Sequence, residues 1–467
     1  MSPHIFRQYD IRGIVGKDFT PQESAQIARA ILHYAKELNI NIRTLVVGRD
    51  ARESSHEIFN HFTQACRNEG INIINIGVVT TPIMYFTLHT TPYIHGVMIT
   101  ASHNPGEYNG FKICFNKKSI SGKAIERIRD IALADKEIAH HSDHGNILPY
   151  DALSRYINNI TKDFAHLHSK KISVVFDCNN GPAGLVIPDL IKKMNWFFCS
   201  TLHEKLDGAF PNQKPDPTVE ANGIKLKTKI IHAPTPTIGI GFDGDADRMA
   251  ARTEDGALVA GDYMLALLSQ NVLAHFPGAR VVVDIKSSNS LTQTIIKNGG
   301  TPIMSPTGHS NIKATMSTNK ALLGGELSGH FFFADKSYGY DDGIYAALRL
   351  IEHLIETQTT LLHAINQLPA STCSPELRIP CAEENKHSVI NTVLAHFSNH
   401  PTAKLITLDG LRIETTYGWG IIRASNTEPV LSLRFEGSDT SGLENIKNDF
   451  LEILKTCVAE EVLAKHF

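Results

Sequence analysis

Three short apolar runs, each ending in a polar turn, constrain the fold of this chain more than any other feature. The runs lie at residues 45–47, 173–176 and 281–283. The turns that follow them contain Gly-Arg-Asp, Asp-Cys-Asn-Asn-Gly and Asp-Ile-Lys-Ser-Ser, and each leads into a segment able to form a helix. Because these units recur at intervals of roughly 110 to 130 residues, they indicate one α/β unit used three times.

The composition of these runs also predicts the kind of sheet they form. Strands that are apolar on both faces are typical of parallel or mixed sheets covered by helices. The last hundred residues differ, because alternating runs at 411–415 and 430–435 are followed by a helical C-terminus. We therefore predict an α/β protein with three similar mixed-sheet domains and a smaller C-terminal α+β domain.

Three changes of pattern divide the chain into four domains. The polar stretch 140–146 separates the first unit from the second, and the turn Asp255-Gly256 follows the second. Near residues 367–371 the alternation of strands and helices changes. We predict domains at residues 1–147, 148–256, 257–368 and 369–467.

The composition excludes partners that require a strong charge. The 467 residues carry a formal net charge of −3, which gives no reason to expect nucleic acid or a membrane surface as a partner. No apolar stretch approaches the roughly 18 residues of a membrane span, and the N-terminus has no apolar signal core. Seven cysteines without a CxxC pair fit reduced thiols, so we expect a cytoplasmic protein.

A serine stands on a turn directly after a further apolar run. Residues 96–99 predict a buried strand, and the sequence Thr-Ala-Ser-His-Asn-Pro places Ser102 after it. Asn104 and Pro105 favour a turn, on which we expect an exposed hydroxyl able to carry a covalent group. Strands also end in such residues for turn reasons alone, so the interpretation depends on a second site.

The second site is an acidic loop after the apolar run 238–242. Asp243, Asp245 and Asp247 stand at alternate positions and can converge on one cation, since like charges this dense are unfavourable without a counter-ion. Oxygen-only ligands indicate Mg²⁺ or a similar hard ion rather than zinc. An acidic calcium-binding loop is the competing interpretation, and Arg248, directly after the aspartates, suits a phosphate brought to the ion.

Two further loops contain residues suited to a sugar phosphate. In Gly-Gly-Glu-Leu-Ser-Gly-His at 324–330, glycines allow close ligand approach, and the three functional side chains can bind adjacent hydroxyls. In Arg-Ala-Ser-Asn-Thr-Glu-Pro at 423–429, an arginine, two hydroxyls and an amide on a turn can hold a phosphate dianion. Either loop alone is equally consistent with an ordinary turn.

Taken together, the segments TASHNP, DGDADR, GELSGH and RASNTEP resemble the α-D-phosphohexomutase family in order and spacing. The resemblance spans essentially the whole chain. It implies four domains around a central active-site cleft, with one motif from each domain. It also implies reversible transfer of phosphate between C6 and C1 of a hexose through a phosphoserine.

The resemblance implies a role for each motif residue. Ser102 corresponds to the phosphoserine, and the implied magnesium ligands are this seryl group with Asp243, Asp245 and Asp247. The implied sugar contacts are Glu326 and Ser328, and the implied site for the distal phosphate comprises Arg423, Ser425, Asn426 and Thr427. The further residues that match cleft positions of the family are Tyr9, Arg12, Lys112, Lys286, His309 and His330.

The implied chemistry needs a metal and several cations. Magnesium would neutralise the phosphoserine, while Arg12, Lys112 and Arg248 add positive charge around the transferring group. Lys112, with a contribution from His309, is our candidate for moving the proton of the sugar hydroxyl. A hexose 1,6-bisphosphate, both intermediate and activator, must then reverse its orientation in the cleft. A mobile C-terminal domain would permit this reorientation.

The sugar loop also indicates the substrate. Leu327 after the glutamate resembles the bacterial phosphomannomutase/phosphoglucomutase subgroup, whereas phosphoglucosamine mutases, the alternative, carry glutamine there. Glu326 and Ser328 are expected to bind O3 and O4, so the site cannot strongly reject either C2 epimer. We expect mannose and glucose phosphates as substrates.

We also expect the product to be used for nucleotide-sugar and polysaccharide biosynthesis. The protein is expected to be a monomer or a weak dimer.

Two rival functions stay open on sequence alone. A phosphatase could use the same metal and serine, although it needs no second phosphate site. A catalytically silent sensor of sugar phosphates is disfavoured by the intact serine and aspartates.

Overall fold

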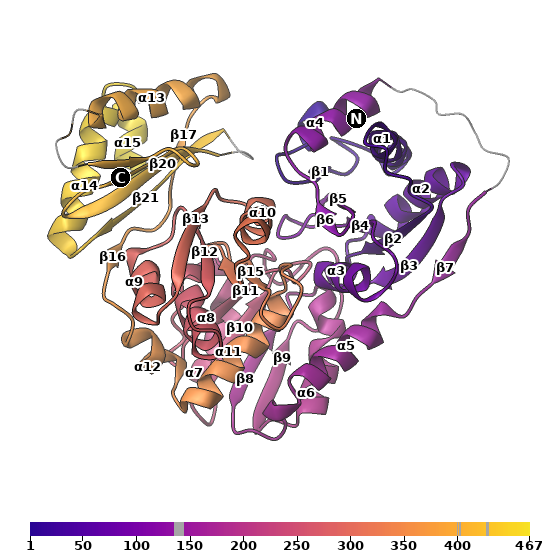
Figure 1. Cartoon of the computed structure of the whole chain (residues 1–467), viewed down its shortest axis with the longest axis horizontal. Helices are drawn as coiled ribbons and strands as arrows, with labels where there is room; N and C mark the ends of the chain where they lie inside the picture. Colours follow the sequence, from indigo (N-terminus) through magenta and orange to yellow (C-terminus); the bar gives the residue numbers. More distant parts are fainter. Residues whose placement is uncertain (135–143, 399, 401–402, 426–428) are drawn as a thin grey trace.

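The computed structural model describes residues 1–134, 144–398, 400, 403–425 and 429–467. Three mixed sheets follow one another along the chain, and an antiparallel sheet follows them. Figure 1 shows the first and last sheets in two separate upper lobes, with the other two sheets below and between them. No helix in these described ranges is both long and apolar enough to cross a membrane. The arrangement confirms the predicted class of three similar α/β domains with a smaller C-terminal α+β domain.

The first sheet has seven strands, in the order β1-β5-β4-β2-β3-β7 with β6 paired to β5. The strands are β1 (Ile11–Ile14), β2 (Thr44–Arg49), β3 (Asn72–Val78), β4 (Gly96–Ile99), β5 (Tyr108–Phe115), β6 (Lys118–Ser119) and β7 (Ile147–Pro149). The helices are α1 (Ser24–Glu37), α2 (Ser55–Asn68), α3 (Thr81–Thr90) and α4 (Lys123–Leu133). The apolar central strands β2 and β4 are buried, as expected of strands that helices cover on both faces.

The second and third sheets have four strands each, in the orders β11-β10-β8-β9 and β13-β12-β14-β15. The second sheet contains β8 (Ser173–Asp177), β9 (Phe198–Leu202), β10 (Ile238–Phe242) and β11 (Met249–Arg252), with α5 (Ala152–Asp163), α6 (Ile187–Met194) and α7 (Ile224–Ile231). The third contains β12 (Arg280–Asp284), β13 (Thr301–Ser305), β14 (Leu323–Gly325) and β15 (Phe331–Phe333). Its helices are α8 (Gly261–His275), α9 (Asn289–Lys297), α10 (His309–Asn319), α11 (Gly343–Thr357) and α12 (Leu361–Asn366).

These three sheets share one topology. In each, a central strand (β2, β8 or β12) pairs in parallel with two neighbours, and one neighbour (β4, β10 or β14) pairs with an antiparallel strand. The antiparallel partners are β5, β11 and β15. The loops that enter these antiparallel strands are 100–107, 243–248 and 326–330. The predicted serine, metal and sugar loops therefore occupy the same position in the three repeats.

The end of the central strand is also repeated. Asp50, Asp177 and Asp284 each follow or close this strand, and each carboxylate accepts the backbone N–H two residues later, at 3.0 to 3.1 Å. An aspartate that bonds its own backbone in this way stabilises a turn. The three polar turns of the sequence are thus one structural device used three times.

The C-terminal sheet is antiparallel, in the order β16-β21-β20-β19-β18 with β17 paired to β21. Its strands are β16 (Thr372–Cys373), β17 (Leu377–Pro380), β18 (Lys404–Ile406), β19 (Leu411–Glu414), β20 (Gly418–Ala424) and β21 (Val430–Gly437). Its helices are α13 (Lys386–Phe397), α14 (Thr440–Leu454) and α15 (Glu460–His466). The helices lie on one side of the sheet in Figure 1.

The hydrophobic cores show which parts of the molecule are joined most firmly. One continuous cluster includes Met84 of α3, Phe176 of β8 and Leu265 of α8, so it connects all three α/β units. The C-terminal sheet packs its own cluster around Phe435. A small separate cluster connects the third unit to the C-terminal sheet through Ile285, Trp419 and Ile421. The C-terminal lobe is therefore attached to the other units by less apolar surface.

Candidate active site

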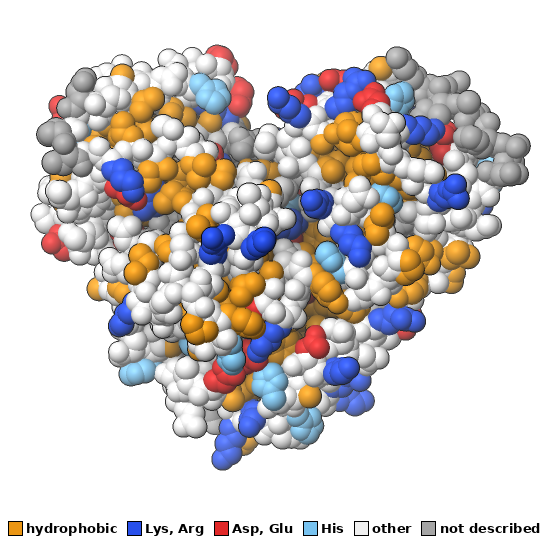
Figure 2. All heavy atoms as spheres, in the orientation of Figure 1, with side chains coloured by type: hydrophobic (Ala, Val, Ile, Leu, Met, Phe, Trp, Pro, Cys, Tyr) orange, Lys and Arg blue, Asp and Glu red, His pale blue; other side chains and the backbone are white. Residues whose placement is uncertain are grey.

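A cavity of about 400 Å³ lies where the four parts of the chain meet. It is lined by eleven of the residues singled out from the sequence, namely Tyr9, Arg12, Ser102, Lys112, Arg248, His309, Glu326, Ser328, His330, Arg423 and Ser425. Figure 2 shows a notch between the upper lobes on this side of the molecule. Lys286 instead lines a neighbouring cavity of about 640 Å³, and Asn426 and Thr427 lie outside the described residues.

Ser102 lies at the floor of the cleft and is more buried than the sequence indicates. Ser102 is 1% exposed, because the acidic loop of the second sheet covers it. The Ser102 hydroxyl donates to Asp243 Oδ2 at 2.8 Å. Its backbone is left-handed at φ 50°, an uncommon conformation for a residue with a side chain. The expected exposed hydroxyl is therefore wrong, and the turn instead directs the oxygen toward a carboxylate.

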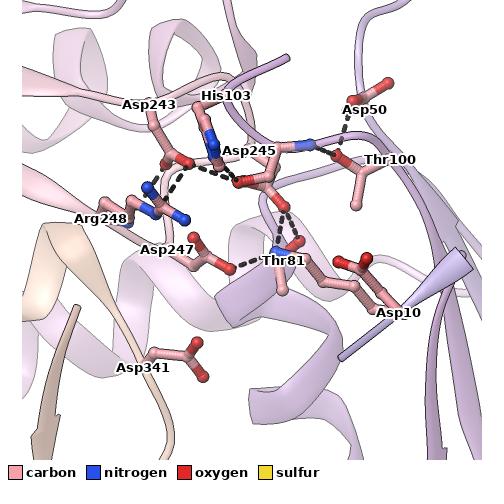
Figure 3. Close-up of polar contacts among 12 residues, drawn as sticks. Asp10, Asp50, Thr81, Thr100, His103, Asp243, Asp245, Asp247, Arg248 and Asp341 are labelled. Atoms are coloured by element: carbon pink, nitrogen blue, oxygen red, sulfur yellow. Dashed lines mark hydrogen bonds and ion pairs between the residues drawn. The ribbon is translucent and has the colours of Figure 1, made fainter. Parts of the chain in front are cut away.

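The three aspartates of the acidic loop converge as predicted. Asp243, Asp245 and Asp247 are fully buried, and carboxylate oxygens of the three lie within 4.8 Å of one another. Figure 3 shows their side chains turned toward one space, with Arg248 beside Asp243. Burial, reinforced by the other two negative charges, raises the pKa of Asp243 well above its usual range.

The donor set fits a hard divalent cation. Its ligands would all be oxygens, and the loop presents them from alternate positions on one turn. The Oδ1 atoms of Asp245 and Asp247 have no hydrogen-bond partner within the part of the chain that the structure describes. Buried carboxylate oxygens without partners are costly, and a bound cation would remove that cost.

Lys112 on β5 faces the same aspartates. Its ammonium group donates to Asp245 Oδ2 at 2.7 Å and also to Asp247 Oδ2. Burial acts to lower the pKa of Lys112, but the two carboxylates outweigh burial and raise it. Burial likewise acts to raise the pKa of Asp245, yet the Lys112 charge and a Thr81 hydrogen bond hold it below its usual value. This pairing keeps Lys112 in its charged form.

Arg12 reaches the cleft from β1, which pairs antiparallel with β5. Its guanidinium bonds Asp10 through Nε at 3.0 Å and through Nη2, and Nη1 donates to Asn104 Oδ1 at 2.8 Å. Asn104 belongs to the serine loop, so Arg12 is held beside Ser102. Arg12 and Lys112 therefore bring positive charge to the serine from neighbouring strands.

Two histidines line the cleft, and a buried aspartate lies beside them. Arg248 Nε donates to His330 Nε2 at 2.9 Å, and since arginine only donates, the ring proton of His330 is left at Nδ1. That nitrogen lies 3.2 Å from Asp341 Oδ2, and the His309 ring stacks on His330 with centroids 5.6 Å apart. Lys313 Nζ contacts the other oxygen of Asp341 at 3.0 Å. The sequence analysis missed Asp341, which no local motif identifies.

The sugar loop is held by one hydrogen bond within the loop and one from Gly308. Glu326 accepts the Ser328 hydroxyl at 2.9 Å and also the backbone N–H of Gly308. Gly308 has φ 116° and lies against the Tyr9 ring, so only glycine fits at this point. Burial raises the pKa of Glu326. The loop thus presents one carboxylate and one hydroxyl side by side, as binding of adjacent sugar hydroxyls requires.

The C-terminal lobe contributes Arg423 from the end of β20. Its guanidinium contacts Asp409 at 3.1 Å, and Asp409 Oδ2 also accepts the backbone N–H of Thr307 at 3.0 Å. Lys286 contacts Glu376, at 3.3 Å. Asp409 was also missed by the sequence analysis, since an Asp-Gly pair signals a turn and not a contact with a distant loop.

The fold and cleft define a class of protein. A serine hydroxyl beside three buried carboxylates, with arginines and a lysine around it, is suited to phosphoryl transfer. The adjacent sugar loop and the distant Arg423 provide places for the rest of a phosphorylated ligand. The site is thus that of a phosphotransferase acting on a small polyhydroxyl phosphate.

Comparisons with known proteins identify the family. Successive segments match the models of phosphoglucomutase/phosphomannomutase alpha/beta/alpha domain I at residues 3–139, domain II at 154–256, domain III at 260–371, and the C-terminal domain at 376–453. The chain belongs to this phosphoglucomutase/phosphomannomutase family and is a phosphohexomutase.

Two relatives whose names state an activity, and one solved structure, agree with that assignment. The chain is 38% identical to a phosphoglucomutase of Neisseria meningitidis over 97% of both proteins. It is 38% identical to a phosphomannomutase/phosphoglucomutase of Pseudomonas aeruginosa over 97% of this chain and 95% of the other. A crystal structure of a phosphoglucomutase/phosphomannomutase family protein from Burkholderia thailandensis superimposes with a TM-score of 0.89 at 32% identity, covering 98% and 99% of the two chains.

Proposed function

We propose that this phosphohexomutase interconverts the 6- and 1-phosphates of glucose and mannose through a phosphoserine at Ser102 and a hexose 1,6-bisphosphate. The observation that carries the proposal is the 2.8 Å contact between Ser102 Oγ and Asp243 Oδ2 at the floor of a cleft lined by all four parts of the chain. The phosphoglucomutase and phosphomannomutase/phosphoglucomutase activities named for the Neisseria and Pseudomonas relatives support the substrate class.

We assign the metal position to Asp243, Asp245 and Asp247, with the seryl group of Ser102 as a further ligand. The buried oxygen-only donor set and its unpartnered Oδ1 atoms support magnesium there. When bound, the ion supplies the charge that stabilises the seryl oxygen as phosphate leaves it.

The cations of the chain surround the transferring group. Arg12 and Lys112 lie on neighbouring strands, and Arg248 Nε lies 3.9 Å from Asp243 Oδ2. In the transfer step the P–O bond to Ser102 breaks, a P–O bond to a sugar hydroxyl forms, and that hydroxyl loses its proton. We assign the movement of this proton to Lys112, with a contribution from His309. Asp245 and Asp247 raise the pKa of Lys112 and hold it charged, so Lys112 must first release a proton of its own ammonium group before it can accept the proton of the hydroxyl.

The sugar loop sets which hexoses are accepted. Glu326 and Ser328 lie 2.9 Å apart and suit two adjacent hydroxyls such as O3 and O4. Glucose and mannose differ at C2, which these two side chains do not need to contact. The site can therefore bind both epimers with similar free energies.

The second phosphate would lie near Arg423, Ser425, Asn426 and Thr427. One fixed serine serves both ends of the hexose, so the bisphosphate must reverse its orientation within the cleft. The separate core of the C-terminal lobe supports a hinge motion of this lobe, which would give the bisphosphate room to reorient.

A coupled assay on mannose, glucose and glucosamine 1-phosphates, with Mg²⁺ and trace bisphosphate, tests the proposal. We expect faster turnover of mannose and glucose 1-phosphates than of glucosamine 1-phosphate. The reverse order would indicate a phosphoglucosamine mutase, and free phosphate released faster than isomerised sugar would indicate a phosphatase.

Replacement of the serine tests its role as the phosphate carrier. Ser102→Ala removes the only oxygen proposed to accept phosphate, so kcat should fall at least about 1000-fold. The Kd of glucose 1-phosphate, measured by calorimetry, should stay within about threefold of that of the parent, because the contacts to the sugar and to the distal phosphate remain. The control is Ser388→Ala at an exposed position of α13, which should leave kcat unchanged. Turnover that persists in Ser102→Ala would exclude the phosphoserine mechanism.

Three broader proposals from the sequence accompany the catalytic one. We place the protein in the cytoplasm, which the seven free thiols support, and we expect a monomer or weak dimer. We also propose the domain division at residues 147, 256 and 368, which limited proteolysis followed by mass measurement would test.

A further inference from the structure

Arg52, which the proposed mechanism does not use, lies directly behind the serine loop. It sits in the turn between β2 and α2, and its side chain is 0% exposed. The phosphohexomutase motifs described above do not include it. A fully buried guanidinium is costly unless each of its donors is paired.

Every N–H group of this guanidinium is used. Nε donates to Asp50 Oδ2 at 2.9 Å, and each terminal nitrogen donates to two backbone carbonyls of the serine loop and its exit. Nη2 donates to the carbonyl oxygens of Ser102 and Asn104, both at 2.7 Å. Nη1 donates to those of Pro105 and, at 3.0 Å, Tyr108. Arginine is the side chain with five donors in a fixed fork, so no other residue can hold this set.

Asp50 completes the support from the other side. Besides pairing with Arg52, it accepts the Thr100 hydroxyl at 2.7 Å, and Thr100 in turn accepts the Ser102 backbone N–H at 2.9 Å. Figure 3 shows the Asp50 and Thr100 contact beside the aspartate cluster. The Ser102 peptide is therefore held at its N–H through Thr100 and at its carbonyl through Arg52.

The second sheet packs against the same point. The Phe210 ring covers the guanidinium, with the Arg52 Cζ atom 5.0 Å from the ring centroid. Gly244 of the acidic loop approaches so closely that a Cβ atom there would clash with the Ser102 carbonyl and contact the Phe210 ring. Arg52 thus lies where the serine loop meets the aspartate loop, and the carbonyl it holds is one that the aspartate loop contacts.

We propose that Arg52 is a positioning residue for phosphoryl transfer, fixing the left-handed Ser102 backbone so that Oγ faces the aspartate cluster. Resting on the proposed role of Ser102 as phosphate carrier, the inference adds a residue that touches neither substrate nor metal. Loss of the fork would let the Ser102 peptide rotate toward ordinary φ values, moving Oγ away from Asp243. The sugar loop and Arg423 would be unaffected.

Arg52→Ala and Arg52→Lys test the proposal by steady-state kinetics and intact-mass measurement of the phosphoserine. A displaced serine lowers transfer and leaves sugar binding intact, so kcat of Arg52→Ala should fall about 100-fold with KM within about threefold. Lysine supplies one point charge without the fork, so Arg52→Lys should lose at least about tenfold in kcat. Millimolar guanidinium should restore at least about tenfold to Arg52→Ala, whereas methylammonium should not.

The matched control is Arg349→Ala. Arg349 is also fully buried, pairs with Asp335 at 2.8 Å and lies over the Phe333 ring, but it is remote from the serine loop. This variant should lose thermal stability while keeping kcat per folded molecule, with no response of kcat to guanidinium. Thermal stability and kcat per folded molecule are measured for the Arg52 variants as well. A positioning residue lowers kcat per folded molecule, whereas a residue that only stabilises the fold does not.

Each outcome decides the question. A folded Arg52→Ala or Arg52→Lys with kcat within threefold of the parent overturns the positioning role. A rise in KM as large as the fall in kcat would also overturn it. If Arg52→Ala does not fold, Arg52→Lys carries the test alone. Turnover that survives in Ser102→Ala overturns the proposed mechanism itself, which distinguishes that failure from failure of the Arg52 proposal.

Discussion

Asp243 both accepts a hydrogen bond from Ser102 and lies buried among other carboxylates. Asp243 must accept the serine hydroxyl at 2.8 Å, yet it lies fully buried with two more carboxylates nearby. Its raised pKa shows that the folded protein opposes its negative charge. A buried carboxyl whose ionisation the fold opposes is poorly suited to a structural role alone and well suited to a cation.

Asp243→Asn separates these two properties. At pH 8 the carboxyl is ionised in the unfolded chain, whereas the fold opposes its charge, so removing it should raise the melting temperature of the metal-free protein. Activity should fall about 1000-fold, because the metal site loses a ligand. Thermal melts in EDTA and in MgCl₂, with kcat measurements, provide the test. Mg²⁺ should raise the melting temperature of the parent and not of the variant; an equal rise in both would contradict the assignment.

The sequence predicted residues whose signal is local and missed residues whose role depends on distant partners. The three aspartates stand at alternate positions in one loop, so their convergence could be predicted. Arg52, Asp341 and Asp409 act on loops far away in the chain. Their local sequences indicate only turns. The burial of Ser102 was missed for the same reason, since the covering loop comes from another sheet.

At the scale of elements, the strands were predictable because their apolar runs are short and sharply bounded. The runs 96–99 and 238–242 are β4 and β10 with the same bounds. The repeat is confirmed at the level of topology, including the antiparallel strand that the sequence did not reveal. What could not be predicted is that each functional loop enters that strand, because pairing direction is not encoded in an apolar run.

Helix α11 begins at a buried aspartate that should make stability depend on pH. Asp342 accepts the Tyr345 N–H at 2.9 Å and the Tyr156 hydroxyl at 2.8 Å, and burial raises its pKa from 3.8 to about 7. Since the folded pKa is the higher one, its stabilising contribution is complete below pH 4 and is lost as pH rises to 7. The loss can reach about 4 kcal/mol.

Asp342→Asn keeps a hydrogen-bond acceptor without the charge. The stability of the variant relative to the parent should therefore increase as pH rises. Melting temperatures at pH 5 and pH 8 measure this difference. The control is Asp151→Asn at the start of α5, where the carboxylate caps Ser154 from an exposed position. Its effect should be the same at both pH values. An Asp342→Asn effect that is likewise independent of pH would show that the buried carboxyl does not titrate in this range.

At the scale of the whole molecule, the cores predict which part moves. A continuous apolar cluster joins the three α/β units, whereas the C-terminal lobe meets them through a small cluster and polar contacts. Arg412 of this lobe donates to the carbonyls of Ile285 and Ser287, and Arg434 pairs with Asp262. Polar contacts of this kind can exchange with water more readily than a packed core. The sequence suggested a mobile C-terminal domain only from the needs of the reaction, whereas the cores show the difference in packing that would allow the motion.

Asp409 is the contact through which that motion should control the bisphosphate. It joins Arg423 of the C-terminal lobe to the Thr307 N–H of the third unit, across the cleft. Asp409→Ala should let the lobe open more often, so more intermediate escapes before it reverses. We expect the concentration of bisphosphate needed for half-maximal activation to rise at least about fivefold, and labelled intermediate to exchange faster with bulk. Glu444→Ala, on an exposed face of α14 in the same lobe, should change neither. Unchanged activation and exchange in Asp409→Ala would mean that reorientation does not depend on this contact.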